Sequence, residues 1–391
     1  VLTSKPKEFK TTSLLSNQNS KYYSRGIILP NSSKDLLTSI HTNKTAEFRG
    51  SIELNFKELS TEPENAIIEK NRLERLDIQF KLNNLERKIY SGKLIHSTSQ
   101  IIYEHPISIG TFNPTKDIQV KKSEKDGLTL YEVDNGFLRF KGDASYRGQI
   151  FSLSVENVNN YFKTFYPEVK PFLWTNEYYG GISGNVRLVD SWNQQDYNKL
   201  KFEGFQIQKG KWKGIGFKSQ VIDYSPNLKG LQVTNEYLTL PDSPFLLYIQ
   251  TIENHSDVKR VFDVGIDVDI KTSETPDDEY YTEVNGKITT FKLDEFESYV
   301  WLHCDYDAKW TAYKNIKNKY YLGAAIQPNK NFLRASVYAP NYTYSTIGIQ
   351  SKRVTLDPKE KNEFKILYIL TDDVNSIGPF ANSNIEEYFE E

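Results

Sequence analysis

The clearest strand pattern in the chain is Phe262-Asp263-Val264-Gly265-Ile266-Asp267-Val268-Asp269-Ile270. Apolar residues alternate with polar residues or glycine along its whole length. Successive side chains of an extended chain point to opposite faces, so this pattern is typical of a β-strand with one buried face. Asp263, Asp267 and Asp269 would share the other face. The simplest interpretation of that face is a solvated sheet surface, and a calcium ion bound by the carboxylates is the alternative.

Further strand signals lie on both sides of this stretch. Residues 76–82 alternate in the same way, and residues 364–370 form a denser apolar run that suits a strand covered on both faces. The dipeptides Asp126-Gly127, Asn135-Gly136 and Asn285-Gly286 predict turns, and the last has the form of a two-residue hairpin. Helical periodicity is confined to residues 155–166 and the acidic C-terminal tail. We therefore predict an all-β fold built from antiparallel strands.

The chain divides into three segments. Residues 1–45 are rich in Ser, Thr, Asn and Lys, and we expect a lead-in or edge segment there. Residues 46–114 contain a few short strands and predict a small Ig-like β-sandwich. Residues 115–391 run on without a linker-like break and predict one large, antiparallel, two-sheet structure. A mild shift from basic to acidic composition supports a boundary near residues 113–120.

Composition argues against several classes of protein. The 49 Lys and Arg residues nearly balance the 51 Asp and Glu residues, whereas a nucleic-acid-binding protein needs a basic excess or stripe. The single cysteine, Cys304, excludes an internal disulfide framework and a Cys-rich zinc site. The five histidines are scattered. We therefore expect no cofactor and no resident metal, apart from the calcium alternative.

The hydropathy of the chain indicates a soluble protein. No apolar run approaches the roughly 18 residues that a membrane-spanning helix needs. The first residues, 1–6, lack the apolar core of a signal peptide. We expect a protein that is cytoplasmic or is part of a larger polypeptide.

Five segments after the predicted boundary carry a family resemblance. One of them is Trp174-Thr175-Asn176-Glu177-Tyr178-Tyr179-Gly180-Gly181, and the others are residues 134–140, 148–153, 233–241 and 246–256. Residues 134–140 and 148–153 resemble the opening strands of the galactose-mutarotase-like β-supersandwich. Residues 174–181 resemble its aromatic Gly-Gly segment, and residues 233–241 and 246–256 resemble its paired central strands. The resemblance covers residues 115–391. It implies a broad concave sheet that binds sugars, in a family of epimerases, lyase and glycosidase modules, and non-catalytic modules.

The aromatic Gly-Gly segment is the first candidate site. Aromatic rings stack on the C–H faces of sugars, and carboxylate, amide and guanidinium groups bind the hydroxyl groups. Six residues supply these groups: Trp174, Asn176, Glu177, Tyr178, Tyr179 and Arg187. Trp192 and Trp212 lie in polar stretches and are predicted at the rim of the site. The alternative is a buried aromatic plug with a glycine bulge, with the two tryptophans as loop anchors.

The second candidate site is a cluster around His303. In a strand, His303 and Asp305 would share one face, so Asp305 could orient the imidazole or contact a ligand. Glu177 and His303 are then the candidate acid/base pair for chemistry on a sugar. The alternative is a half-buried structural strand.

The sequence thus predicts a carbohydrate-binding or carbohydrate-processing module of a larger sugar-active protein. One alternative is a sugar-active enzyme of epimerase, lyase or hydrolase type that uses Glu177 and His303. A second alternative is a non-catalytic structural or surface protein.

Overall fold

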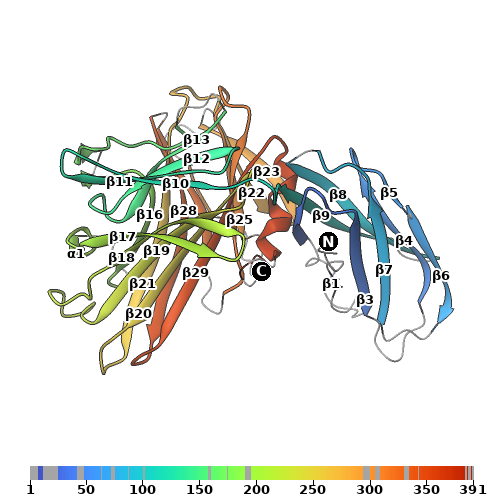
Figure 1. Cartoon of the computed structure of the whole chain (residues 1–391), viewed down its shortest axis with the longest axis horizontal. Coiled ribbons are helices and arrows are strands. Elements are labelled where there is room, and N and C mark those ends of the chain that lie inside the picture. The colour runs from blue at the N-terminus through green and yellow to red at the C-terminus, as the bar shows by residue number, and fades with distance from the viewer. Residues whose placement is uncertain are drawn as a thin grey trace.

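The structure of the protein is a computed structural model. It describes residues 8–11, 25–41, 48–62, 64–71, 75–86, 88–99, 102–156, 160–173, 175–189, 195–293, 300–303, 309–329, 334–341, 343–383, 385 and 389. Figure 1 shows a smaller N-terminal part, in blue, beside a larger body of strands coloured from green to red.

The larger part contains two nine-stranded antiparallel sheets. The first, called the front sheet here, consists in spatial order of β10 (Gln119–Lys125), β11 (Leu128–Asp134), β12 (Leu138–Asp143), β13 (Gln149–Val155), β16 (Gly181–Arg187), β21 (Arg260–Ile270), β28 (Tyr344–Leu356), β27 (Arg334–Asn341) and β24 (Val300–His303). The second, the back sheet, consists of β17 (Phe202–Lys209), β18 (Trp212–Ser219), β19 (Leu231–Thr239), β20 (Phe245–Asn254), β29 (Lys361–Thr371), β26 (Tyr321–Ile326), β25 (Trp310–Lys314), β22 (Glu279–Val284) and β23 (Lys287–Lys292). The predicted all-β, two-sheet fold is confirmed.

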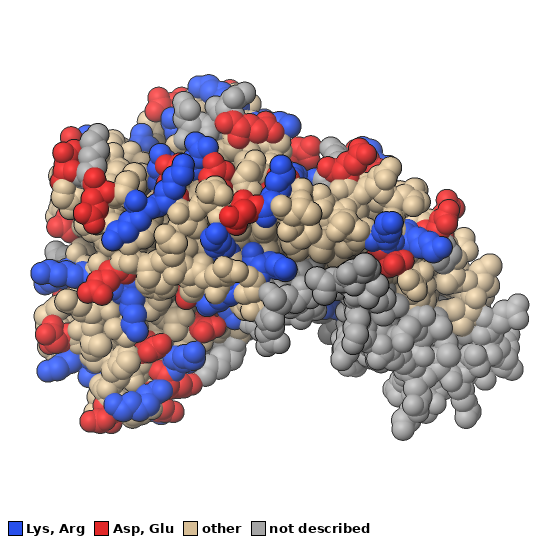
Figure 2. All heavy atoms as spheres, viewed as in Figure 1, with Lys and Arg blue, Asp and Glu red and all other residues tan. Residues whose placement is uncertain are grey.

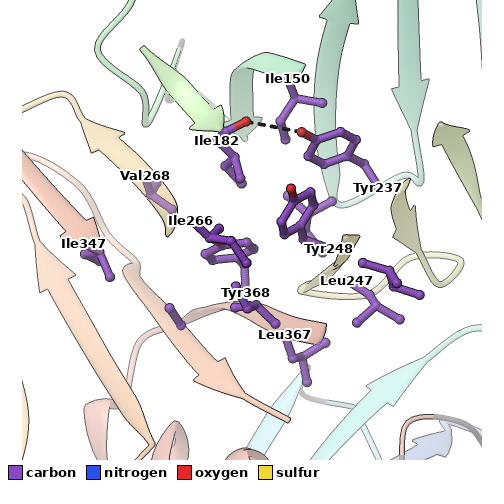
Figure 3. Close-up of a cluster of buried hydrophobic side chains, with 14 of the residues drawn as sticks. Ile150, Ile182, Tyr237, Leu247, Tyr248, Ile266, Val268, Ile347, Leu367 and Tyr368 are labelled. Atoms are coloured by element: carbon purple, nitrogen blue, oxygen red, sulfur yellow. Dashed lines mark hydrogen bonds between the residues drawn. The ribbon is translucent and has the colours of Figure 1, made fainter. Parts of the chain in front are cut away.

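The main hydrophobic core lies between these two sheets. Figure 3 shows side chains of the front sheet, such as Ile182 and Ile266, packed against Tyr237, Tyr248 and Leu367 of the back sheet. The Tyr237 hydroxyl also donates a hydrogen bond across the core to the Ile182 carbonyl, at 3.2 Å. The front sheet therefore has one face in the core and one face directed away from it.

Both Asn-Gly turns are confirmed. In the β22–β23 hairpin, Asn285 and Gly286 have φ values of 53° and 71°, the left-handed region that a tight two-residue turn requires. The helix expected at 155–166 is wrong for the residues described there. Val155 ends β13, and Phe162 and Thr164 form isolated bridges with Ile270 and Gly180.

The smaller N-terminal part consists of two sheets around a core of its own. The five-stranded sheet has the order β2 (Arg25–Pro30), β9 (Ile102–Phe112), β8 (Ile89–Thr98), β4 (Phe48–Phe56) and β6 (Asn65–Asn71). The four-stranded sheet has the order β1 (Glu8–Thr11), β3 (Asp35–His41), β7 (Arg75–Leu82) and β5 (Thr61–Glu62).

The N-terminal sheets include strands from the segment expected to be a lead-in or edge. β2 does lie at the edge of its sheet, but β3 lies between β1 and β7. Ile27 and Leu29 of β2 are buried in the N-terminal core, which explains why this segment joins the sandwich. The Ig-like character of this part remains a prediction.

Short segments complete the chain: the strands β14 (Lys170–Phe172) and β15 (Thr175–Tyr178), the helix α1 (Gln195–Asn198), and the 3-10 helices η2 (Val374–Ser376) and η3 (Gly378–Asn382). In Figure 1 the red C-terminal helical segment lies where the two parts meet. Phe380 of η3 packs directly on the backbone of Gly26 and against Phe245 of the back sheet. The C-terminal segment thus connects the N-terminal part to the larger part.

Charged side chains of both signs are interspersed over the described surface that Figure 2 shows. Many of the ion pairs there are exposed, such as Lys93–Glu104 at 2.6 Å. Exposed pairs of this kind contribute little to stability. Several charged side chains of the front sheet are buried instead, among them Arg187, Asp263 and Asp269. Their burial has to be explained by their own contacts.

Candidate functional site

The candidate site is the outer face of β16 and β21, adjacent strands in the middle of the front sheet. Ile266 and Val268 of β21 point into the core, as Figure 3 shows. Because side chains alternate along a strand, Asp267 and Asp269 point to the outer face. Ser183 of β16 pairs with Asp267. The two faces of these strands are therefore chemically opposite, one apolar and one polar.

The polar side chains of the outer face are largely buried. Asn185, Arg187, Asp263 and Asp269 are between 0% and 8% exposed, and Asp267 is partly exposed. The solvated face expected for these aspartates is therefore wrong, because side chains from β16 and β28 lie across it. Buried charges need partners, and the contacts below show what they are.

Asp269 is held by hydroxyl groups from β28. Tyr344 and Thr346 both donate hydrogen bonds to Asp269 Oδ1, at 2.9 and 3.0 Å. Burial and the neighbouring carboxylate of Asp267 raise the pKa of Asp269 to about 7, against the effect of the two hydroxyl groups. Near neutral pH, a large fraction of the molecules therefore carry a proton on this carboxyl group.

Asp267 has different neighbours. Its Oδ2 lies 3.4 Å from the Asn185 amide nitrogen. Burial raises the pKa of Asp267, and the guanidinium groups of Arg187 and Arg147 oppose that rise. Asp267 and Asp269 thus share a strand face and the influence of Arg147, but their hydrogen-bond partners differ: an amide for Asp267 and two hydroxyl groups for Asp269. The charge of Asp267 acts on Asp269, and carboxyl groups that interact strongly titrate as a pair.

Glycines on either side of Asp267 make room for this arrangement. A Cβ at Gly265 would lie 2.9 Å from Asn185 Oδ1, and a Cβ at Gly348 would lie 3.1 Å from both Asp267 Oδ1 and Ser336 Oγ. Contacts this short force the neighbouring atoms to move. The polar side chains can therefore lie flat over the sheet only because these positions carry no side chain.

Arg147 reaches the site from the turn before β13. Its side chain is 6% exposed, and its guanidinium carbon lies 4.9 Å and 5.0 Å from the ring centres of Tyr179 and Tyr197. Both rings favour a cation at such distances. The Arg147 backbone is left-handed, with φ of 58°, and Asp143 fixes the same turn by accepting hydrogen bonds from the Ser145 backbone and hydroxyl, both at 2.7 Å. A left-handed non-glycine residue is typical of sites where the surrounding structure imposes the geometry.

Aromatic side chains border the carboxyl pair. The Tyr178 ring centre lies 4.9 Å from Phe172, 5.7 Å from Phe165 and 6.1 Å from Tyr344. Tyr344 is the same residue that binds Asp269. The aromatic cluster therefore adjoins the polar face.

The predicted site residues fall into three groups. Arg187 lies near Asp267, Tyr179 lies against the Arg147 guanidinium, and Tyr178 lies in the aromatic cluster. Asn176 and Glu177 are exposed, and Glu177 Oε2 accepts a hydrogen bond from Asn198 at 2.8 Å. A last group, Trp174, Trp192 and Asp305, lies outside the described residues.

The structure corrects the predicted position of Trp212. It was expected at the rim, but it is 0% exposed and belongs to the core between the sheets. Its indole is large and apolar, and β18 directs it inward, so burial was favoured over exposure. A side chain with no exposed surface cannot stack on a ligand.

The backbone of His303 is described, at the end of β24. Strand pairing places it in a cross-strand row that runs through Asp267, Gly348 and Ser336 to His303. It is three strands from β21, about 14 Å at the usual strand spacing. Asp267 and Asp269 are thus closer to each other than either is to the predicted histidine.

Sequence reasoning missed most of the contacts of this site. The alternation at 262–270 identified the aspartates, but as a solvated surface or a calcium site. Arg147 and Tyr344 lie far from them in the sequence, and neither position carried a signal. Among the described residues, no three His, Cys, Asp or Glu side chains gather as a metal site would need. None of the helices in the described part of the chain has the length and hydropathy of a membrane span.

Neither a family model nor a curated protein matches the sequence. Similar solved structures include a TPR-domain containing protein from Parabacteroides distasonis, with 10% identity, a TM-score of 0.49, and coverage of 87% of this chain and 56% of that one. A galactose mutarotase-like protein from Lactobacillus casei has 11% identity and a TM-score of 0.44, with 65% of this chain and 100% of that chain covered. An alpha-galactosidase from Geobacillus stearothermophilus has 11% identity and a TM-score of 0.44, with coverage of 65% and 41%. The Lactobacillus casei protein carries the name of the galactose-mutarotase-like class that residues 115–391 resemble.

Proposed function

We propose that the chain binds a carbohydrate on the outer face of β16 and β21. The observation that carries this proposal is that the partly exposed Asp267 lies on a polar sheet face beside an aromatic cluster in which Phe172 and Tyr344 are also partly exposed. Carboxylate, amide and guanidinium groups can bind sugar hydroxyls, and the aromatic rings can meet the C–H faces. The resemblance of residues 115–391 to sugar-binding supersandwich proteins supports the same proposal.

The test is a direct binding measurement on the full chain. We would titrate D-galactose, D-glucose, D-mannose and D-galacturonate and follow ligand signals by saturation-transfer NMR and heat by calorimetry. Asp267→Asn should weaken the affinity for the bound sugar at least tenfold, because the variant removes the charge that accepts from a ligand hydroxyl. The matched control is Glu124→Gln on the exposed edge strand β10, which should bind as the native chain does.

The result that would overturn the proposal is equally direct. If none of the four sugars binds, or if Asp267→Asn binds them unchanged, this face is not the sugar site. The non-catalytic structural or surface role would then be favoured.

A second candidate function is a sugar-active enzyme. The specific observation in its favour is that Asp267 and Asp269 lie on one face in different environments, since such pairs divide into a proton acceptor and a proton donor. The pair of Glu177 and His303, which the sequence predicts, is the competing proposal. Anomerisation of freshly dissolved α-D-galactose, followed by polarimetry, separates them: loss of activity in Asp269→Asn but not in Glu177→Gln supports the aspartate pair, and the reverse supports the predicted pair.

A further inference from the structure

We propose that the sugar bound on this face is an acidic one, a uronate, and that Lys163 selects it by pairing its ammonium group with the sugar carboxylate. This inference rests on the proposed sugar-binding function, and it adds the substrate class of the same site and the residue that determines it.

The backbone holds Lys163 beside Asp269 of β21. The Lys163 amide donates to the Asp269 carbonyl at 2.9 Å, and the Lys163 carbonyl accepts from the Gly181 amide at 3.2 Å. The preceding residue, Phe162, forms an antiparallel bridge with Ile270, and both of these side chains are buried in the core. Because neighbouring side chains of an extended segment point to opposite faces, Lys163 and Asp269 both lie on the outer face.

The ammonium group of Lys163 lies against the aromatic cluster. Its nitrogen is 5.5 Å from the ring centre of Phe172 and 5.8 Å from that of Phe165, distances at which the rings favour a cation. The Phe172 ring centre is in turn 5.8 Å from that of Tyr344. Lys163, Phe172 and Tyr344 are all partly exposed. A ligand that lies on these two rings can therefore reach the ammonium group.

The charge of Lys163 is not neutralised by a neighbour in the part of the chain that the structure describes. Its nitrogen forms no ion pair with any carboxylate there, whereas nearby Lys170 pairs with Glu168 at 3.3 Å. Asp269, its cross-strand neighbour, is 8% exposed and already has other partners. Two hydroxyl groups of β28 donate to Asp269 Oδ1 at 2.9 and 3.0 Å, and Tyr178 is a further partner. The ammonium group of Lys163 therefore remains available to an anion from outside the protein.

These positions define what the ligand must present. Asp267 is partly exposed and lies two residues from Asp269 along β21, about 7 Å at the usual strand rise. Asp267 can accept a hydrogen bond from a sugar hydroxyl, whereas Lys163 needs an anion. A uronate offers both, with hydroxyl groups on its ring carbons and a carboxylate in place of the hydroxymethyl group, and its C–H face can lie on Phe172 and Tyr344. A neutral hexose leaves the ammonium group without an ionic partner.

The experiment compares D-galacturonate with D-galactose, which differ only in the carboxylate that replaces the hydroxymethyl group. The Kd values are measured by calorimetry at pH 7 and low ionic strength, because salt screens a partly exposed ion pair. We expect the native chain to bind D-galacturonate about tenfold more tightly than D-galactose. Lys163→Gln should weaken D-galacturonate binding about tenfold and leave D-galactose binding unchanged, and Lys163→Arg, which keeps the charge, should retain the preference.

The matched control removes one positive charge elsewhere. Lys218 is exposed on β18 of the back sheet, and Lys218→Gln should bind both sugars as the native chain does. Urea unfolding of each variant checks that it folds as the native chain does. D-galactose 6-phosphate tests the nature of the anion: if it binds more tightly than D-galacturonate and depends on Lys163, the uronate assignment is overturned.

The remaining outcomes separate this inference from the proposed function. If D-galactose binds and D-galacturonate binds no more tightly, the role of Lys163 is overturned and the sugar site stands. The same holds if Lys163→Gln binds D-galacturonate as tightly as the native chain, or loses D-galactose equally. If none of the four sugars of the binding panel binds, the proposed function fails, and the uronate assignment fails with it.

Discussion

Asn135 is the residue that most clearly connects local sequence to the fold. Its side chain is fully buried and makes five hydrogen bonds of 2.7–2.9 Å: it donates to Thr239 Oγ1, the Leu240 carbonyl and the Ser243 carbonyl, and it accepts from the Phe137 and Leu138 backbone amides. Asn135→Ala should lower the free energy of unfolding by about 3 kcal/mol, because several buried partners lose their hydrogen bonds together. Urea unfolding followed by tryptophan fluorescence measures the change.

The control for that prediction is the other Asn-Gly turn. Asn285 is exposed and has a left-handed backbone. Asn285→Ala should therefore cost only about 1 kcal/mol, from the backbone conformation. Equal losses in the two variants would show that the Asn135 side chain does nothing beyond forming its turn.

At the scale of elements, β8 and β9 carry a buried histidine pair in the N-terminal part. His96 and His105 are 2% and 3% exposed, and their ring centres are 5.1 Å apart. Burial, with a smaller effect of His105, lowers the pKa of His96 to about 3, and burial also lowers the pKa of His105. The His96 imidazole is therefore neutral in the folded protein over most of the acidic range, and burial also disfavours the charged form of His105.

This pair predicts acid sensitivity of the N-terminal part. The unfolded chain takes up protons on histidine below about pH 6.5, and folded His96 does not until about pH 3. The stability from His96 is therefore complete above pH 6.5 and is lost as the pH falls, by about 2–3 kcal/mol at pH 4.5. Hydrogen exchange of β8 and β9 peptides, corrected for intrinsic exchange, should show this loss.

Two histidine variants check the cause. His96→Leu should remove most of the pH dependence between 6.5 and 4.5. His255→Gln, at an exposed histidine of the larger part, should leave it in place. Acid sensitivity that persists in His96→Leu would assign the effect to carboxylates instead.

At the scale of the molecule, the contact between the two parts determines how the chain responds to cleavage. Ser91 donates to Asp373 at 2.7 Å, and Lys88 forms an ion pair with Asp242 at 2.7 Å. We predict that limited proteolysis first cuts within residues 1–45 or near 113–120, and that residues 115–391 remain one unit. The fragments produced by a cut near 113–120 should still elute together on size exclusion, because these contacts and η3 hold them.

A single substitution should separate those fragments. A Cβ at Gly110 would overlap the Phe245 ring and crowd Phe380. Gly110→Val should therefore release the N-terminal fragment after cleavage, and Ser123→Val on exposed β10 should not. Early cleavage inside 225–260 into two stable halves would contradict the single-unit prediction.

The strand character of this protein could be predicted from local sequence patterns. Alternation at 262–270 and the Asn-Gly turns are local properties, since a strand's two faces and a turn's left-handed backbone depend on neighbouring residues. The all-β, two-sheet fold could therefore be predicted before the structure was known. The candidate segment at 174–187 also contributed Tyr179 and Arg187 to the site.

The burial of the outer face of β21 depends on tertiary contacts that no local pattern shows. The alternating sequence pattern of a strand is the same whether its polar face contacts water or other side chains. The sequence therefore favoured a solvated surface for Asp267 and Asp269. Their burial depends on Arg147, about 120 residues earlier, and on Tyr344 and Thr346, brought alongside by the β21–β28 pairing. Trp212 was misplaced for the same reason: whether an indole lies at a surface or between sheets is set by the second sheet, whose position no local pattern records.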